Sequence, residues 1–423
     1  MAGAYPQPIV RHRVEHRASL RSPHTVEVRR PLTVVALVAV AVVVVVTAAV
    51  AAIPAQAAAP LQVPAAKLDF SGVGLCEEAG GGQAVRVCYQ RKLLALIEAS
   101  RDPANALPQV DLYAHSVGGV LDQECHILMH WVGRQYGVDE HVGFAGLQDL
   151  LPRSNDAGCS AGFAHGLISS LGKDLLDHGS QGALAACHAA ATRYRCYSCV
   201  HGLGHAYMRA YDETLAPALA ACKALGTVDA ADCAAGAFHD YWLALQGADR
   251  AKVPRQPISS PRALCARQPV WAVRGCWYRA LLEHPPAKIP DRARDLPSLC
   301  TGLAGLQRAG CVTGAMVVWG DDPFRQLAGC ASLAAVADAA ACVRGVKGQA
   351  LAGRPVADLV RLVTGCAAFA AAAREPCARW LGTELQVVTD GRFLAEGCPA
   401  AGGLAAACAA GARSSDGALE TFS

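Results

Sequence analysis

The chain is poor in aromatic and charged residues, and its first 75 residues contain no cysteine. Aromatic residues make up 6% and charged residues 17% of its 423 residues, and the formal net charge is +3. Because a nucleic-acid-binding protein needs a basic surface, we expect no nucleic-acid partner. The sequence also lacks a phosphate-binding glycine loop, a dinucleotide fingerprint, a Gly-x-Ser-x-Gly motif and a His-Glu-x-x-His motif. These absences argue against a nucleotide cofactor and against kinase, dehydrogenase and serine hydrolase activity.

Charge is missing altogether from residues 32–53, an apolar run that follows a basic stretch. The Ala-Gln-Ala sequence at 55–57 suits cleavage by a signal peptidase. A run of about 22 apolar residues can also span a bilayer. We therefore expect residues 1–57 to be a signal peptide or an N-terminal membrane anchor. The rest of the chain is then extracytoplasmic, either secreted or held at the cell membrane by residues 32–53.

The 19 cysteines all follow residue 75, and most form couples separated by nine to eleven residues. Regular couples of this kind predict disulfides formed in an oxidising compartment. A ninth, longer couple follows by elimination and leaves Cys196 as a thiol. The predicted disulfides are Cys76 with Cys88, Cys125 with Cys159, Cys187 with Cys199, Cys222 with Cys233, Cys265 with Cys276, Cys300 with Cys311, Cys330 with Cys342, Cys366 with Cys377, and Cys398 with Cys408.

Alanine-rich segments with capping residues predict an all-α fold in which each cysteine couple joins the two helices of a hairpin. One such hairpin is expected at residues 215–225 and 232–245. The couples recur about every 30 to 43 residues, which is typical of a helical-hairpin array resembling an α-solenoid. After the leader (1–57) we expect a flexible linker (58–72), a His-rich helical domain (73–246), a linker (247–262), Cys-paired helical repeats (263–412) and a disordered tail (413–423).

Three cysteines are each followed by glycine at the third position and by histidine at the sixth. These histidines are His165, His205 and His239, and they fall at the same point of successive units. The later cysteine units often keep the glycine but lack the histidine. The glycine is therefore predicted to serve helix packing, and the histidine a separate purpose.

Two histidine pairs, His126 with His130 and His201 with His205, have a spacing of four residues within expected helices. Side chains four apart share one helix face, so both rings of a pair can reach one ion. Imidazole suits zinc, copper and iron, so the sequence predicts a transition-metal site. Its candidate ligands are His126, His130, His165, His201, His205 and His239. Asp122, Glu124 and Asp240, the last as a neighbour that orients His239, are candidate supporting carboxylates.

A simpler interpretation is that these histidines are hydrogen-bonded core residues, since buried polar groups usually find partners. Clustering of two pairs with a repeated register favours the metal site over that interpretation. The remaining histidines of this region have no such register, and we interpret them as surface or structural residues. They are His115, His141, His178 and His188.

Cys196 and Cys199 are separated by two residues, which is also the spacing of redox dithiols and of covalent haem sites. Val200, not histidine, follows Cys199, which argues against covalent haem. Since Cys199 is assigned to Cys187, a thiol-disulfide oxidoreductase that uses Cys196 is the weakest function that we consider.

The sequence thus predicts an exported or membrane-tethered helical repeat protein with a His-cluster metal site and with redox or hydrolytic chemistry if a coordination position is open. Whether it is an enzyme stays open at this point. The alternative is a non-catalytic module that binds a protein or cell-envelope partner and uses its histidines for packing.

Overall fold

The computed structural model describes residues 67–78, 80, 82–150, 158–189, 193–244, 260–320, 322–346, 351, 354–389 and 391–414. Within these ranges the chain forms α-helices and short 3-10 helices and no strand. None of the described helices is long and apolar enough to cross a bilayer. The predicted leader, most of both predicted linkers and nearly all of the predicted tail lie outside the described residues.

The helices up to residue 244 include four long ones, α2, α4, α9 and α11, joined by shorter ones. Their bounds are η1 (Gly74–Glu78), α2 (Gly82–Ser100), α3 (Pro103–Val117), α4 (Gly119–Asp139), α5 (Phe144–Leu150), α6 (Gly158–Ser169), α7 (Gly172–His178), α8 (Gln181–His188), α9 (Arg193–Ala210), α10 (Leu215–Lys223) and α11 (Thr227–Ala244).

The helices from residue 261 onward range from short 3-10 segments to the 18-residue α18. Their bounds are α12 (Pro261–Cys265), α13 (Val273–Glu283), η4 (Ala293–Cys300), α14 (Gly305–Val317), α15 (Pro323–Ala331), α16 (Val336–Val343), α17 (Val356–Gly365), η6 (Cys366–Ala368), α18 (Ala371–Val388), α19 (Phe393–Glu396), η7 (Cys398–Leu404) and α20 (Ala405–Ala412).

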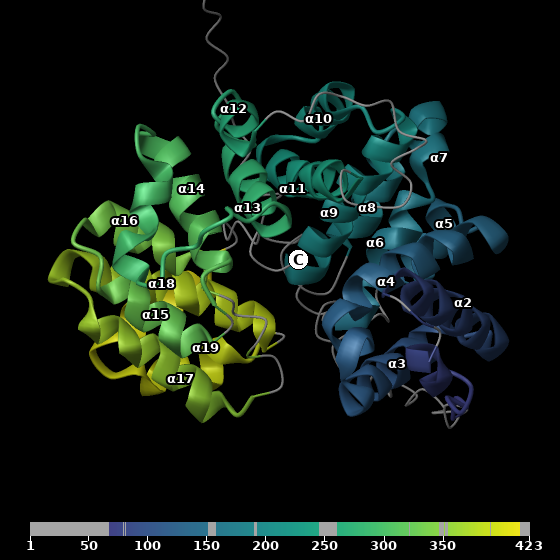
Figure 1. Cartoon of the computed structure of the whole chain (residues 1–423), viewed down its shortest axis with the longest axis horizontal. Helices are drawn as coiled ribbons and strands as arrows, with labels where there is room; N and C mark the ends of the chain where they lie inside the picture. The colour runs from purple at the N-terminus through teal and green to yellow at the C-terminus, as the bar shows by residue number, and fades with distance from the viewer. Residues whose placement is uncertain are drawn as a thin grey trace, which may run out of the picture. The chain divides into compact units, whose positions relative to one another are not determined.

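A series of helices packs one against the next along the chain. The contacts run from α4 to α6, α9, α11, α13, α14, α16, α18 and α20, each with its successor. The short helices that precede several of them pack alongside, for example α8 on α9, α10 on α11 and α15 on α16. Figure 1 shows α9, α11 and α13 next to one another in this order.

Nine disulfides cross-link these helices, and they are the nine pairs that the cysteine spacing predicts. They join Cys76 with Cys88, Cys125 with Cys159, Cys187 with Cys199, Cys222 with Cys233, Cys265 with Cys276, Cys300 with Cys311, Cys330 with Cys342, Cys366 with Cys377, and Cys398 with Cys408. So many disulfides are typical of proteins from oxidising, extracytoplasmic compartments.

Eight of the disulfides join a helix to the helical segment that directly precedes it. Cys88 of α2 is bonded in this way to η1, Cys377 of α18 to η6, and Cys408 of α20 to η7. In these three pairs, and in η4 and α14 joined by Cys300 and Cys311, the preceding segment is a 3-10 helix and not the α-helix expected for a hairpin. The Cys125–Cys159 disulfide differs from the other eight, because it joins α4 to α6.

Glycines in the middle of the packed helices let neighbouring backbones touch. A Cβ atom on Gly162 of α6 would lie 2.1 Å from the carbonyl oxygen of His126 in α4. A Cβ atom on Gly236 of α11 would lie 1.9 Å from the carbonyl oxygen of His201 in α9. No larger residue fits at either crossing, so the repeated glycine serves packing, as predicted from its persistence in units without histidine.

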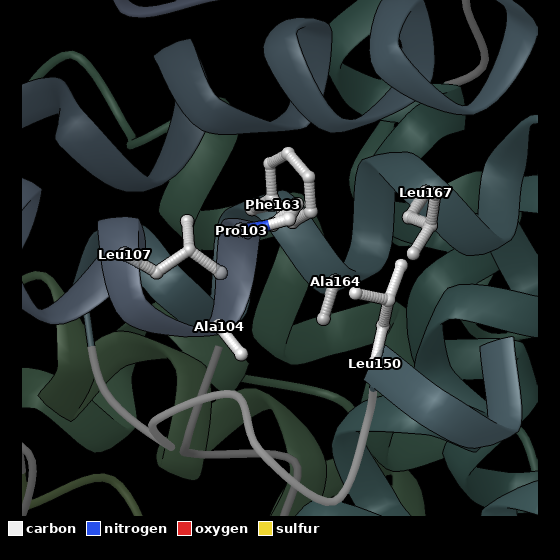
Figure 2. Close-up of a pocket in the computed structure, with 7 residues that line it drawn as sticks. All are labelled: Pro103, Ala104, Leu107, Leu150, Phe163, Ala164 and Leu167. Carbon is white, nitrogen blue, oxygen red and sulfur yellow. The ribbon is translucent and has the colours of Figure 1, made fainter. Parts of the chain in front are cut away.

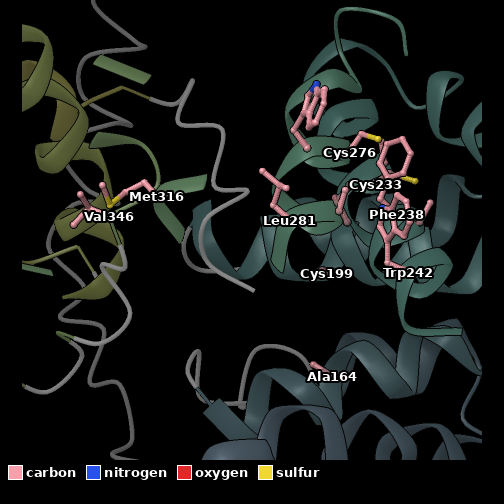
Figure 3. Packing of buried hydrophobic residues seen from close by; sticks show 14 of the residues in the cluster. Ala164, Cys199, Cys233, Phe238, Trp242, Cys276, Leu281, Met316 and Val346 are labelled. Atoms are coloured by element: carbon pink, nitrogen blue, oxygen red, sulfur yellow. The ribbon is translucent and has the colours of Figure 1, made fainter. Parts of the chain in front are cut away.

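Large apolar side chains fill the remaining space, and the cystines are buried among them. Phe238 and Trp242 of α11 are fully buried near Cys233 and Cys276 (Figure 3). The hairpin expected at residues 215–225 and 232–245 forms as α10 and α11, but α11 begins at Thr227. Residues 224–226 connect the two helices, and Gly226 has a φ of +104°, a backbone conformation that glycine adopts readily.

Candidate metal centre

Six histidines from four successive helices form one cluster. α4 contributes His126 and His130, α6 contributes His165, α9 contributes His201 and His205, and α11 contributes His239. Most neighbouring ring centroids are 4.8 to 5.7 Å apart, among them His130–His205 at 4.8 Å and His205–His239 at 5.1 Å. These are the six residues that the sequence singles out as candidate ligands, and the helix crossings at Gly162 and Gly236 bring them together.

Three overlapping sets of three rings each place one nitrogen per ring within 4.8 Å of the others. The sets are His126, His130 and His165; His130, His205 and His239; and His165, His201 and His205. A tetrahedral ion with bonds of about 2.0 to 2.1 Å to nitrogen needs donors about 3.3 Å apart. The Nε2 atom of His130 lies 3.1 Å from Nε2 of His126 and 3.2 Å from Nδ1 of His165, which matches this spacing.

The geometry at His130 Nε2 differs from that of a simple hydrogen-bonded core. A ring nitrogen carries either one hydrogen or one lone pair, so it forms one good hydrogen bond. His130 Nε2 nevertheless has two other ring nitrogens at hydrogen-bond distance. Three lone pairs directed at one shared ion would account for both short distances at once, whereas hydrogen bonding accounts for only one.

The interior of the cluster is buried, and its α4 side is more open. His165, His201, His205 and His239 are at most 1% exposed, whereas His126 and His130 are partly exposed. Neither ring nitrogen of His201 or of His239 has a hydrogen-bond partner among the described residues. Leaving a buried polar atom unpaired costs about 1 to 3 kcal/mol, so these nitrogens favour a bound ligand.

Burial also keeps four of the six rings neutral. It lowers the pKa values of His130, His165, His201 and His239 well below 6.5, and neighbouring histidines and the cation of Arg279 lower them further. Neutral imidazole has the lone pair that a metal requires, whereas imidazolium has none. These four rings are therefore available as ligands at neutral pH.

Two polar neighbours orient individual rings. Nε2 of His165 lies 2.7 Å from the Ser198 hydroxyl and Nδ1 of His205 lies 2.9 Å from Oδ1 of Asp240. If each of these nitrogens donates its hydrogen, the other nitrogen of the ring keeps its lone pair for the cluster. Burial raises the pKa of the Asp240 carboxyl, but the interactions with His205 and Arg209 outweigh burial and hold the pKa below its ordinary range.

The supporting carboxylates differ from those expected. Asp240 contacts His205 and not its sequence neighbour His239, because adjacent helical residues point about 100° apart. His239 instead has Glu283 of α13 as its nearest carboxylate, 3.7 Å away. Asp122 contacts His115 at 2.6 Å, and Glu124 accepts two hydrogen bonds from Arg86. These two carboxylates are therefore engaged with other residues.

Three contributors to the site were missed from the sequence, namely Ser198, Arg279 and Glu283. Arg279 is 1% exposed within α13, but the same helix also contains Arg274, so the sequence does not single out Arg279. Glu283 lies one turn further along the same face, and burial raises its pKa. Ser198 has no signal either, because serine is common in helices of every kind.

A small apolar pocket between α3, α5 and α6 is a weaker candidate for a binding site (Figure 2). Its lining residues are all apolar, Phe163 and Leu167 among them. It encloses about 10 Å³, which is room for no more than one water molecule. It therefore has neither the size nor the polar groups of a substrate site.

Cys196 lies in α9 and is not in a disulfide, whereas Cys199 is bonded to Cys187. A dithiol of Cys196 and Cys199 is thus not formed. His115, His141, His178 and His188 lie outside the cluster of six and are exposed. No protein-family model, no characterised protein and no solved structure significantly matches this chain.

Proposed function

We propose that this chain is an extracytoplasmic transition-metal protein whose ion is held by the histidine cluster of α4, α6, α9 and α11. The observation that carries the proposal is the double contact of His130 Nε2 with His126 and His165, at 3.1 and 3.2 Å. Hydrogen bonding alone cannot satisfy both contacts, whereas coordination of one ion would. The ring nitrogens of His201 and His239, which have no hydrogen-bond partner among the described residues, also favour a bound ion.

The donor set favours zinc, copper or iron. All six candidate ligands are imidazoles, which suit these metals, and none is a thiolate that would select a softer ion. A set of three histidines, such as His126, His130 and His165, would leave a fourth position for water or a small substrate. Partial exposure of His126 and His130 supports access from the α4 side. Such a centre could carry out hydrolytic or redox chemistry.

The remainder of the chain is proposed to be a scaffold of stapled helical hairpins, arranged as an α-solenoid-like array. Its support is the order of helix contacts from α11 through α13 and α14 to α20, together with one disulfide in each unit. Residues 32–53 would tether this array to the membrane unless the leader is cleaved.

The competing proposal is an interaction module without metal, in which the histidines only pack. The two proposals predict different metal contents for the purified protein. The full chain should be produced in an oxidising host, so that its disulfides form, and analysed for zinc, copper and iron by plasma mass spectrometry. We expect a near-stoichiometric amount of one of these metals.

Variants sharpen this experiment. His126→Ala and His201→Ala should each lower the metal content strongly, because they remove rings from the partly exposed and the buried side of the cluster. His178→Ala is the matched control, since His178 is exposed and outside the cluster. Metal-free protein that is helical and fully cross-linked, and that does not take up added zinc, copper or iron, would overturn the metal proposal.

A further inference from the structure

A second group of metal-binding residues lies outside the histidine cluster, where three helix ends meet. His188 is the last residue of α8, Cys196 lies in the first turn of α9, and Asp229 lies in the first turn of α11. One ligand atom from each residue lies within 4.8 Å of the other two. Nε2 of His188 lies 3.0 Å from Oδ2 of Asp229.

We propose that His188, Cys196 and Asp229 form a second cation site, which binds one zinc-like divalent ion through one nitrogen, one sulfur and one oxygen. All three donor types are ordinary zinc ligands, and a water molecule completes a tetrahedral shell in zinc sites with three protein ligands. The His188 side chain is 50% exposed and that of Asp229 is 15% exposed. Solvent therefore reaches the site and can supply the fourth ligand.

Disulfides hold the three residues in place. Cys187, the neighbour of His188, is bonded to Cys199, which lies close to Cys196 on α9. Cys233 lies one turn beyond Asp229 and bonds α11 to α10. Since α8 and α11 both pack against α9, the cross-links limit how far the three donors can move apart. Preorganised donors favour metal binding because little conformational freedom is lost when the ion arrives.

This site is distinct from the histidine cluster and does not depend on it. Cys196 and His201 are five residues apart on α9, which corresponds to a rotation of about 140° around the helix axis. The two groups therefore lie on different sides of α9. The sites also differ in chemistry, because the cluster of six histidines contains no sulfur donor.

The simpler alternative is a surface ion pair between His188 and Asp229 with a thiol nearby. Sulfur distinguishes the two cases, because thiolate bonded to Co²⁺ produces a charge-transfer absorption in the near ultraviolet that imidazole and carboxylate do not. Thiolate ligation also releases the thiol proton. The probe is therefore Co²⁺ added to the metal-free full chain, after a thiol titration has shown that Cys196 is reduced.

We expect wild-type protein to develop the charge-transfer band with the uptake of one Co²⁺ ion. Cys196→Ser should abolish the band and remove that one equivalent, while His126→Ala should leave the band unchanged. His178→Ala is the control for loss of a surface imidazole, in contrast to His188→Ala, which should weaken the affinity of the site.

A second readout works on wild-type protein and avoids any folding defect of the variants. Zn²⁺ should slow the alkylation of Cys196 by iodoacetamide, and prior alkylation should prevent the cobalt band. A wild-type chain with a titratable Cys196 but without the band would overturn the proposal. So would a band that persists in Cys196→Ser, or alkylation at the same rate with and without Zn²⁺.

Discussion

Nδ1 of His205 lies 2.9 Å from Oδ1 of Asp240, and both side chains are buried where α9 meets α11. When the carboxylate accepts the hydrogen of Nδ1, Nε2 keeps its lone pair directed at the cluster. Carboxylates that hydrogen-bond a ligating histidine fix the tautomer and the orientation of its ring, and they make it a stronger donor. Asp240 of α11 therefore orients the candidate ligand His205 of α9 and makes it a stronger donor.

Asp240→Asn should weaken metal binding by about 10- to 100-fold, the usual effect of removing such a carboxylate. The amide keeps the size of the side chain but loses the charge that stabilises a hydrogen on Nδ1. Affinity is measured by competition with a chelator of known strength. Asp177→Asn, which removes an exposed carboxylate beside Lys173, is the control and should leave the affinity unchanged. Equal affinities for both variants would contradict the assigned role of Asp240.

Gly236→Ala should destabilise the fold and disturb the cluster, because its Cβ atom would lie 1.9 Å from the carbonyl oxygen of His201. Helices α9 and α11 must then move apart. We expect a loss of about 1 to 3 kcal/mol in the free energy of unfolding, as is typical of overpacked interiors, together with a lower metal content. Urea denaturation measures the first effect. Gly143→Ala is the matched control, since a Cβ atom there meets nothing within 4 Å.

The metal-free protein should lose stability when acidified below about pH 6.5. The folded-state pKa values of His130, His165, His201 and His239 are lowered, so the unfolded chain binds more protons in this range. Each such proton makes the free energy of unfolding fall by about 1.4 kcal/mol per pH unit. The stability is complete above the unfolded-state pKa and is lost as the pH falls through the folded-state pKa.

Urea unfolding at several pH values tests this slope. His239→Gln should make it shallower by about one proton, because glutamine does not titrate. His178→Gln, at an exposed position, should not. A slope that is the same in the wild-type chain and in His239→Gln would show that these rings do not resist protonation in the folded state.

Two disulfides close loops of equal length, but we expect their removal to have different effects on the metal content. Replacing Cys330 and Cys342 by serine opens a loop of 12 residues far along the chain from the histidines. It should cost about 3 kcal/mol of stability and leave the metal content intact. Replacing Cys187 and Cys199 opens a loop of the same length beside His201, so stability and metal content should both fall. Thermal unfolding and metal analysis of the two double variants would separate these outcomes.

Covalent and periodic features of this chain were predictable from sequence. A short helical hairpin brings its two cysteines together, so couples at constant spacing specify their own partners, as with Cys300 and Cys311. Histidines at a fixed spacing from those cysteines lie at equivalent positions of successive helices. That is why His165 and His239 both contact the ring of His205, although 74 residues separate the first from the last.

Contacts that depend on helix rotation were not predictable. Asp240 follows His239 in sequence but faces His205, since the register of α11 against α9 decides which ring it meets. The meeting of His188 with Asp229 depends on where α8 ends and where α11 begins. Because α11 starts directly after Gly226, Asp229 lies in its first turn, and no spacing rule in the sequence gives that position.

The close packing of helix backbones at Gly162 and Gly236 determines how an ion would be gained and lost. Zinc fingers collapse when stripped of metal because the ion itself organises their chain. Here the imidazoles lie on helices that pack directly on one another, and a disulfide joins α4 to α6, so the helices would stay in place when the ion is lost. Exchange would then be governed by passage past His126 and His130, and the chain could be filled and drained repeatedly without refolding.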